Sequence, residues 1–250
     1  MSDCDRTALF SNGNGFVALN SPVKIQILDF LKISSRSFDE IVKHTGKAKS
    51  TVSVHLNDLR SSGLVEEEYD PDDKRRKTYH LKCEYMAHSQ PPILKHYRNV
   101  LETLASPRLE KHGCFKCFFR AIQFGFDAHG INSDPIMRKV GRDIGISISS
   151  NFNSKDIEFL IKELAEFWKR YQMGTMYVEN REPLVIAVEH SFDYKLISTI
   201  GKNLCSFTEG IIEGTIVHSL NLTCCVQEVE CCGNGKERCL FVVHFLNKNK

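Results

Sequence analysis

The first third of the chain contains three short stretches with apolar residues at helical spacing. The first is SPVKIQILDFLK, in which a Ser-Pro pair can begin a helix over 21–32. The second is SFDEIVKHTG, where Ser37 and Glu40 have capping-box spacing and Gly46 can end the helix. The third covers 48–62, with its polar side chains on the face opposite the apolar ones. The pattern predicts three consecutive helices.

Two strand-like runs follow these helices. They read LVEEEY over 64–69 and RKTYHL over 76–81, and they flank the polar run DPDDKRR, which favours a turn. Three helices and a hairpin with a basic tip describe a winged helix-turn-helix, whose third helix enters the major groove while the wing contacts phosphates. The predicted contacts with double-stranded promoter DNA are Lys49, Ser50, Thr51, Ser53, His55, Asn57, Arg60, Lys74, Arg75, Arg76 and Lys77.

The same region, over about residues 18–82, resembles the DNA-binding domain of arsenical-resistance regulators of the ArsR type, especially in STVSVHLNDLRSSGLV. For each feature alone, the alternative is a solvated helix face and a soluble loop tip. Acidic and basic residues nearly balance over 1–82, which supports that alternative. The order of the elements favours DNA binding, because four consecutive basic residues fall where the wing tip is expected.

Residues 83–113 are the predicted connector. Proline residues bound the amphipathic stretch ILKHYRNVLETLA, which predicts a helix. Its apolar stripe consists of Ile93, Tyr97, Leu101 and Leu104. This stripe can pack on a second copy of itself, which would give a homodimer, or against the chain's own domains. A homodimer suits DNA half-sites that lie about one helical turn apart.

From residue 114 onward, helical and strand-like segments alternate. Helices are predicted over 115–129, 134–150, 154–171 and 195–219. Strands are predicted over 174–180, 183–190, 222–230 and 239–246, with Asn234-Gly235 as a tight-turn signal. The predicted fold class is α+β, with a winged helix-turn-helix at 1–82, a connector at 83–113 and an α+β sensor domain at 114–250.

Composition narrows the classes of protein that this chain can belong to. Its 250 residues are 42% apolar, enough to bury a core in each of two domains. No cleavable leader and no run of ~18–20 apolar residues is present, so we expect a cytoplasmic protein without a membrane partner. Ten cysteines among 250 residues are a smaller share than the ~8–10% cysteine content typical of disulfide scaffolds. Metal binding or reversible thiol chemistry is therefore favoured over permanent disulfides.

Four residues near the end of the chain have the character of metal ligands. Cys205, Glu228, Cys231 and Cys239 supply three thiolates and one carboxylate, and a hairpin can bring the last two sulfurs together. This donor set suits tetrahedral zinc. Four protein ligands would leave no open position, so the ion would be structural. The alternative is that these are buried apolar cysteines with a surface glutamate. Cys205 is expected on the predicted helix 195–219, where Gly210 and Gly214 would permit a close approach.

The segments CSFTEGIIEGTI and VQEVECCGNGKERCLFVV resemble the vinyl-4-reductase domain, and the resemblance covers about residues 114–246. It implies a small-molecule-binding α+β module. In zinc-bearing members a helix cysteine, a strand glutamate and two hairpin cysteines hold the metal, and these match the four residues above. The combination of both domains resembles the methanogen-specific redox-responsive transcription regulators of archaea. That resemblance implies a homodimeric repressor whose thiols control promoter binding.

Five further cysteines are candidate redox thiols. Cys224 and Cys225 are neighbours on a predicted strand, so their side chains point to opposite faces and do not pair with each other. Each of these two cysteines and Cys232 can form a disulfide with another cysteine, or can act as a resolving thiol that reacts with an oxidised ligand cysteine. The alternative is that they are small buried apolar residues. Cys114 and Cys117 form a CxxC pair, for which helix packing and a partial metal site are the alternatives.

Two other functions are compatible with parts of the sequence. A regulator can respond to a small apolar or aromatic ligand, with the Phe-rich run FKCFFRAIQFGF and Trp168 lining a pocket, although such residues also form cores. A reductase is the weaker alternative, because no GxGxxG fingerprint is present and GNGKERC lies in a predicted hairpin. We therefore do not expect an enzyme.

Overall fold

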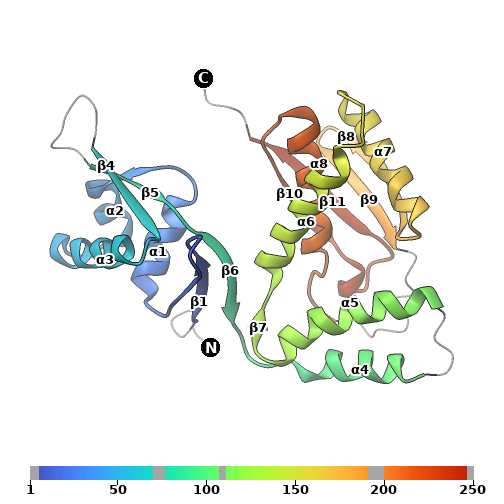
Figure 1. Cartoon of the computed structure of the whole chain (residues 1–250), viewed down its shortest axis with the longest axis horizontal. Coiled ribbons are helices and arrows are strands. Elements are labelled where there is room, and N and C mark those ends of the chain that lie inside the picture. Colours follow the sequence, from blue (N-terminus) through green and yellow to red (C-terminus); the bar gives the residue numbers. More distant parts are fainter. Residues whose placement is uncertain (1–5, 70–76, 107–110, 191–199, 247–250) are drawn as a thin grey trace. The chain divides into compact units, whose positions relative to one another are not determined.

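A computed structural model describes residues 6–69, 77–106, 111–190 and 200–246 (Figure 1). The chain divides into an N-terminal unit, Met1–Pro91, and a C-terminal unit, Pro92–Lys250. The boundary lies after Pro91 rather than after residue 82, because one further strand belongs to the first unit. Helices and strands occur in both units, so the predicted α+β class is confirmed.

The three predicted helices of the N-terminal unit are present. They are α1 (Pro22–Leu31), α2 (Phe38–Thr45) and α3 (Lys49–Ser61). The capping box of α2 forms as predicted, since Glu40 N donates to Ser37 Oγ and Ser37 N donates to Glu40 Oε2. Gly46 ends α2 in the left-handed region, with φ 64°. Ser21 occupies the N-cap of α1 without a side-chain capping bond.

The predicted hairpin is also present. Strands β4 (Val65–Tyr69) and β5 (Lys77–Leu81) pair antiparallel, and the short β3 (Arg36–Ser37) adds to the other side of β5. The wing tip, with Lys74, Arg75 and Arg76, lies outside the described residues. Apolar side chains of the helices and the hairpin make one core, including Ile27, Leu28, Ile41, Leu56, Leu59 and Leu64.

Three further strands of this unit were not predicted from the sequence. Strand β1 (Ala8–Ser11) pairs antiparallel with both β2 (Phe16–Leu19) and β6 (Glu84–Ser89). Each run is too short to show a clear period by itself, so its pairing partners decide its conformation. Phe10 of β1 is fully buried, and its ring lies 5.4 Å from that of Tyr85.

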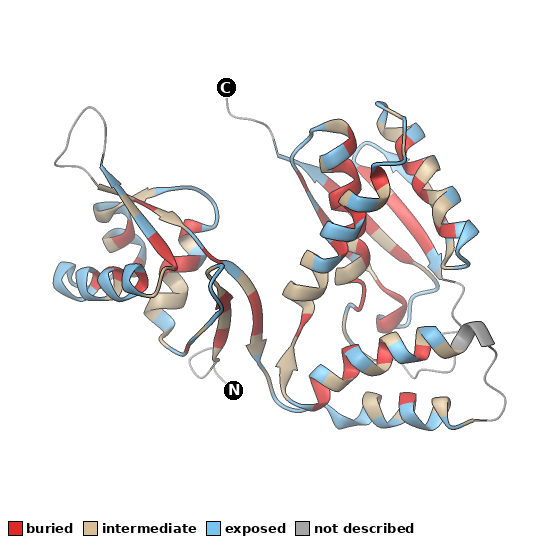
Figure 2. Cartoon of the chain, in the orientation of Figure 1, coloured by how far each residue is buried: buried red, intermediate tan, exposed pale blue. Residues whose placement is uncertain are grey.

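The C-terminal unit packs helices on an antiparallel sheet (Figure 1). Its helices are α4 (Leu94–Leu104), α5 (Lys111–Ala128), α6 (Asp134–Ser149), α7 (Ile157–Arg170) and α8 (Ser206–Leu220). Its strands are β7 (Ile131–Asn132), β8 (Gly174–Arg181), β9 (Leu184–His190), β10 (Cys224–Glu230) and β11 (Cys239–Phe245). The last four make one sheet in the order β10-β11-β9-β8. Buried residues follow β9, β11 and most of α8 (Figure 2).

Helices α6 and α8 cross at unusually short distance. A Cβ added to Gly141 of α6 would lie 2.1 Å from Phe207 O, and one added to Gly210 of α8 would lie 2.0 Å from Arg138 O. Gly145 and Gly214 make equivalent backbone contacts. The close approach predicted for Gly210 and Gly214 is therefore real, and the neighbour that it admits is helix α6.

Two of the predicted helices are present with the following bounds. The helix predicted over 195–219 begins at Ser206, and residues 195–199 of that prediction lie outside the described ones. Helix α4 confirms the predicted connector helix, with Val100 as its buried residue. Within the described ranges, no helix has both the length and the apolar character needed to cross a bilayer.

Replacing Gly141 by alanine is expected to lower the free energy of unfolding by about 1–3 kcal/mol, because the new methyl group collides with backbone. The matched control is Gly125→Ala in α5, where a Cβ meets the Tyr97 ring at an ordinary 3.5 Å. That variant should be neutral or more stable by up to ~1 kcal/mol. Chemical denaturation measures both, and equal midpoints for the two variants would contradict the close crossing.

Candidate metal centre and nucleic-acid interface

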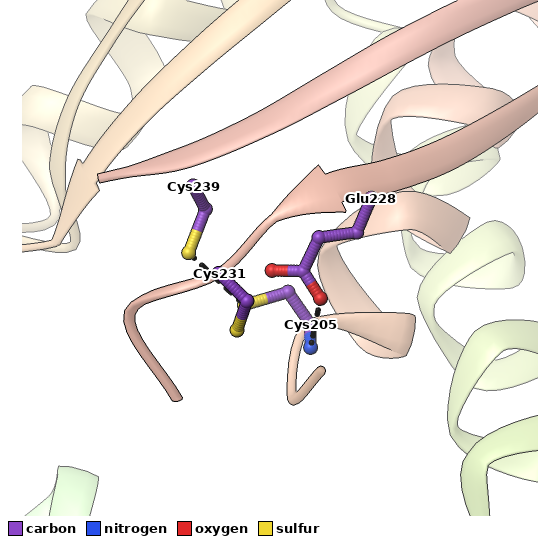
Figure 3. A group of neighbouring side chains, drawn as sticks. All are labelled: Cys205, Glu228, Cys231 and Cys239. Atoms are coloured by element: carbon purple, nitrogen blue, oxygen red, sulfur yellow. Dashed lines mark hydrogen bonds between the residues drawn. The ribbon is translucent and has the colours of Figure 1, made fainter. Parts of the chain in front are cut away.

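Cys205, Glu228, Cys231 and Cys239 converge at one end of the sheet (Figure 3). One ligand atom from each lies within 4.8 Å of the others, and all four residues are buried. Glu228 is on β10, Cys231 follows that strand, and Cys239 begins β11. Cys205 is the N-cap residue of α8 and not, as predicted, a residue within the helix. The four predicted ligands thus form a cluster that can hold a metal ion.

The turn between β10 and β11 shapes the sulfur side of the cluster. A short 3₁₀ turn, Cys232–Asn234, follows Cys231, and Gly235 ends it with φ 81°. Gly233 N donates to Cys231 Sγ at 3.3 Å, and Cys232 N donates to Cys239 Sγ at 3.4 Å. Backbone N–H groups aimed at sulfur stabilise thiolates, which are the form that binds metal.

The pKa values of the four residues in the cluster are shifted because their acidic groups are buried close together. Burial, followed by the nearby Cys231, raises the pKa of Glu228 to about 8. Hydrogen bonding with Cys231 raises the pKa of Cys205, and hydrogen bonding with Cys205 raises the pKa of Cys239. The same sulfur contacts lower the pKa of Cys231, so the negative charge concentrates there. A bound cation would remove the mutual repulsion and allow all four groups to ionise.

One buried oxygen supports a metal at this position. Glu228 Oε2 accepts from Cys205 N at 3.2 Å, whereas Glu228 Oε1 is buried with no hydrogen-bond partner among the described residues. An unpartnered buried carboxylate oxygen beside three sulfurs is costly unless an ion binds it. Three sulfurs and one oxygen are a donor set that zinc accepts in tetrahedral geometry. The residues present therefore fit a structural zinc ion.

Polar side chains from α6 and α8 hold the backbone of β10. Glu228 N donates to Glu209 Oε1 at 2.6 Å, and Val226 N donates to Glu213 Oε2 at 3.4 Å. The Arg138 guanidinium donates to Val226 O at 2.7 Å and pairs with both glutamates. These contacts satisfy backbone groups on the free edge of β10 and fix the strand that carries Glu228.

Helix α5 holds the segment before Cys205 through buried polar residues that the sequence reasoning missed. Gln123 Nε2 and the Arg120 guanidinium donate to Leu204 O at 3.1 and 3.3 Å, and Asp127 pairs with Lys202 at 2.7 Å. The spacing of these three residues places them on one helix face, and this spacing was the sequence signal that could have identified them. The surrounding phenylalanines obscured it.

The candidate redox thiols lie in different environments. None of the described cysteines is in a disulfide. Cys232 is buried, with its Sγ 3.7 Å from Cys239 Sγ. Cys224 is buried and Cys225 is exposed, so the two point to opposite faces as predicted. Burial raises the pKa of Cys224 to about 12, which keeps this thiol protonated at neutral pH.

On helix α5, burial also raises the pKa of Cys117, while Cys114 is half-buried. The CxxC pair therefore sits in a helix as two separate thiols rather than as a bridge.

The predicted DNA contacts on α3 lie at positions that are accessible to solvent. Lys49, Ser50, Thr51, Ser53, Asn57 and Arg60 are exposed, and His55 is half-buried. Val54 is exposed on the same helix and was missed by the sequence reasoning; an apolar side chain there can contact a thymine methyl group. Whether these residues contact bases stays a prediction.

Three of the predicted cationic contacts are already paired. Lys49 pairs with Asp39 at 2.9 Å, while Arg60 and Lys77 share Glu67 at 3.0 and 2.8 Å. The Lys49 pair is exposed, and such pairs contribute only ~0–1 kcal/mol, so a phosphate group can compete for Lys49. The Glu67 side chain, by contrast, is only 9% exposed.

The comparisons with known protein families identify two domains, in the order that the sequence predicted. Residues 21–67 match the family described as bacterial regulatory protein, arsR family, and residues 184–245 match the vinyl-4-reductase domain. The chain carries an arsR-type helix-turn-helix followed by a vinyl-4-reductase domain. The first match contains α1 to α3, and the second contains Cys205, Glu228, Cys231 and Cys239.

About half of the chain is similar to proteins of the archaeon Methanocaldococcus jannaschii. MJ0150 is 28% identical over 52% of this chain and 75% of its own length, and MJ1642 is 29% identical over 48% and 70%. A crystal structure of a vinyl-4-reductase family protein from the same organism is 22% identical, covers 62% of this chain and 92% of that one, and has a TM-score of 0.40.

If the four-residue cluster holds zinc, removing one of its ligands is expected to weaken the binding of the ion. Cys231→Ser and Glu228→Gln should each lower zinc affinity by roughly tenfold or more, because three donors and an unbalanced charge remain. Elemental analysis and the thiolate-to-cobalt absorption of the cobalt-loaded protein measure this. Cys225→Ser, outside the cluster, is the control and should keep the metal. Unchanged metal content in the two ligand variants would contradict the assignment.

Proposed function

We propose that this chain is a redox-responsive transcription regulator, a repressor, that binds double-stranded promoter DNA as a homodimer in the cytoplasm. In this proposal the arsR-type helix-turn-helix supplies the DNA contacts, and the vinyl-4-reductase domain acts as a sensor rather than as an enzyme. The observation that supports redox sensing is the position of a fourth sulfur, Cys232 Sγ, 3.7 Å from the candidate ligand Cys239 Sγ.

The proposed sensing step is a disulfide between Cys232 and Cys239. Their sulfurs must approach from 3.7 Å to about 2.05 Å, which small torsional changes can achieve. A peroxide is the oxidant: the two thiols lose two electrons and two protons, an S–S bond forms, and hydrogen peroxide becomes two water molecules. Cys239 is then lost as a ligand. Zinc would dissociate and leave Glu228 and two thiols buried without a cation.

Loss of the ion would weaken the end of the sheet, because a structural zinc contributes on the order of 10 kcal/mol in small peptide sites. The strand β10 and the segment before α8 meet at this cluster. In the proposed mechanism, the affinity of the arsR-type domain for promoter DNA depends on whether the vinyl-4-reductase domain is well folded.

A second candidate input is a small apolar or aromatic molecule that carries a hydrogen-bond acceptor. Trp168 is buried in the core of the C-terminal unit, and its indole N–H is without a hydrogen-bond partner among the described residues. A ligand acceptor could satisfy this donor. The surface grooves favour this input less, since the 560 Å³ groove between α7 and β8 is lined by charged residues as well as apolar ones.

The DNA-binding proposal predicts that Thr51→Ala and Asn57→Ala weaken binding to a duplex from the protein's own promoter by about 1–3 kcal/mol each. Both side chains are exposed on α3, so alanine should leave the fold intact. Asn153→Ala, at an exposed position in the other unit, is the matched control. Fluorescence anisotropy measures affinity, and unchanged binding by both α3 variants would overturn the recognition face.

The redox proposal predicts that hydrogen peroxide changes promoter affinity of the native chain by roughly tenfold or more, and that Cys232→Ser abolishes this response. The variant should keep its zinc and the affinity of the reduced protein, because Cys232 is not a ligand. Cys225→Ser should respond like the native chain. If affinity ignores peroxide in the native chain but shifts with an added aromatic molecule, ligand sensing replaces the thiol switch.

A further inference from the structure

Helix α5 has an unusual distribution of side chains, because large apolar residues lie on its exposed face and polar residues occur on its buried face beside Cys117 and Phe124. Its exposed face carries Phe115, Phe118, Ile122 and Phe126, which are 77%, 51%, 60% and 37% exposed. Its buried face carries Arg120, Gln123 and Asp127, engaged with the segment before the metal cluster. Exposed and buried residues alternate along α5 in Figure 2. An apolar stripe of this length on a surface marks an interface.

A groove runs beside this stripe. It has a volume of about 580 Å³, lies between α4 and α5, and is lined by Tyr97, Phe118, Ala121, Ile122, Gly125 and Phe126, with His129 and Ile131 at one end. Ala121 and Gly125 are small and lie four residues apart on the floor of the groove, and the Tyr97 ring, 3.5 Å from the position of a Cβ on Gly125, forms its opposite wall. The phenylalanines and Ile122 form a ridge along its side. Ridge and groove therefore occur together on one surface.

We infer that this surface binds a second copy of the chain, with α5 packed on α5 about a two-fold axis. In an isologous interface the same patch must complement itself, and a ridge next to a groove of small residues meets that requirement. The ridge of one copy enters the groove of the other beside Ala121 and Gly125. The inference rests on the proposed function in one respect: reading two half-sites requires a dimer.

The size and the charge of the exposed apolar surface on α5 are compatible with the binding of a second copy of the chain. Phenylalanine side chains bury ~150–250 Å² each, so the four partly exposed residues leave on the order of 400 Å² of apolar surface. Two such patches with their groove walls approach the ~1,000 Å² expected of a specific interface. Between Cys114 and Phe126 the charged residues are Lys116 and Arg120, and Arg120 points into the core. No row of like charges along this stretch opposes self-association.

The test is sedimentation velocity on the full-length chain without DNA. The double substitution Phe118→Glu and Ile122→Glu should convert a dimer to a monomer, because it places four carboxylates in the interface. Phe159→Glu is the matched control: Phe159 is 61% exposed on α7, away from the groove, and its variant should stay dimeric. Zinc content and circular dichroism establish that each variant is folded. A double variant that is folded and still dimeric overturns the proposal, and so does a native chain that is monomeric throughout.

A second variant tests the groove itself. Gly125→Leu keeps the ridge but fills the floor, so dimer dissociation should become roughly tenfold easier, whereas Gly125→Ala should have little effect. Equal dimer affinity for Leu and Ala would show that another surface of the chain makes the dimer. Promoter binding separates the two proposals. A dimer that fails to bind DNA contradicts the regulator and leaves the interface standing. A monomeric double variant that binds DNA as tightly as the native chain removes the dimer from the regulatory mechanism.

Discussion

The burial of four acidic ligand groups within 4.8 Å of one another is the constraint that organises the C-terminal unit. Three thiols and a carboxylate cannot all carry charge in a dry core unless a cation balances them. Their surroundings provide what such an ion would require: backbone N–H groups directed at two sulfurs and a carboxylate oxygen with no other partner among the described residues. The turn between β10 and β11 and the start of α8 are both positioned by this requirement.

The packing of the helices and the geometry of the cluster depend on each other. The glycines of α6 and α8 bring the two backbones together, and this places Arg138 between Glu209 and Glu213. The same three side chains then bind the free edge of β10, next to Glu228. An exposed strand edge is prone to pair with other chains, so these contacts protect the edge as well as position a ligand.

Helix α5 connects the cluster to the surface of the molecule. Its buried polar residues hold Leu204 and Lys202, while Phe115, Phe118 and Phe126 are exposed. A change at Cys205 would reach α5 through Leu204, the residue that precedes it. In the proposed dimer, the sensor site and the interface would be opposite faces of one helix. This arrangement suits a regulator, because a change of ligation can alter the geometry of two DNA-binding units.

The sequence by itself determined the local elements whose signals lie within a few residues, such as the capping box of Ser37 and Glu40 and the spacing of the four ligands. It also indicated the two domain types. Only the tertiary structure decided features that depend on distant partners: the pairing of β1 with β6, the position of Cys205 outside α8, and the α6 backbone as the neighbour of Gly210. The burial of Arg120, Gln123 and Asp127 on α5 belongs to this second group. Helical spacing shows that two faces differ, but packing decides which one is buried.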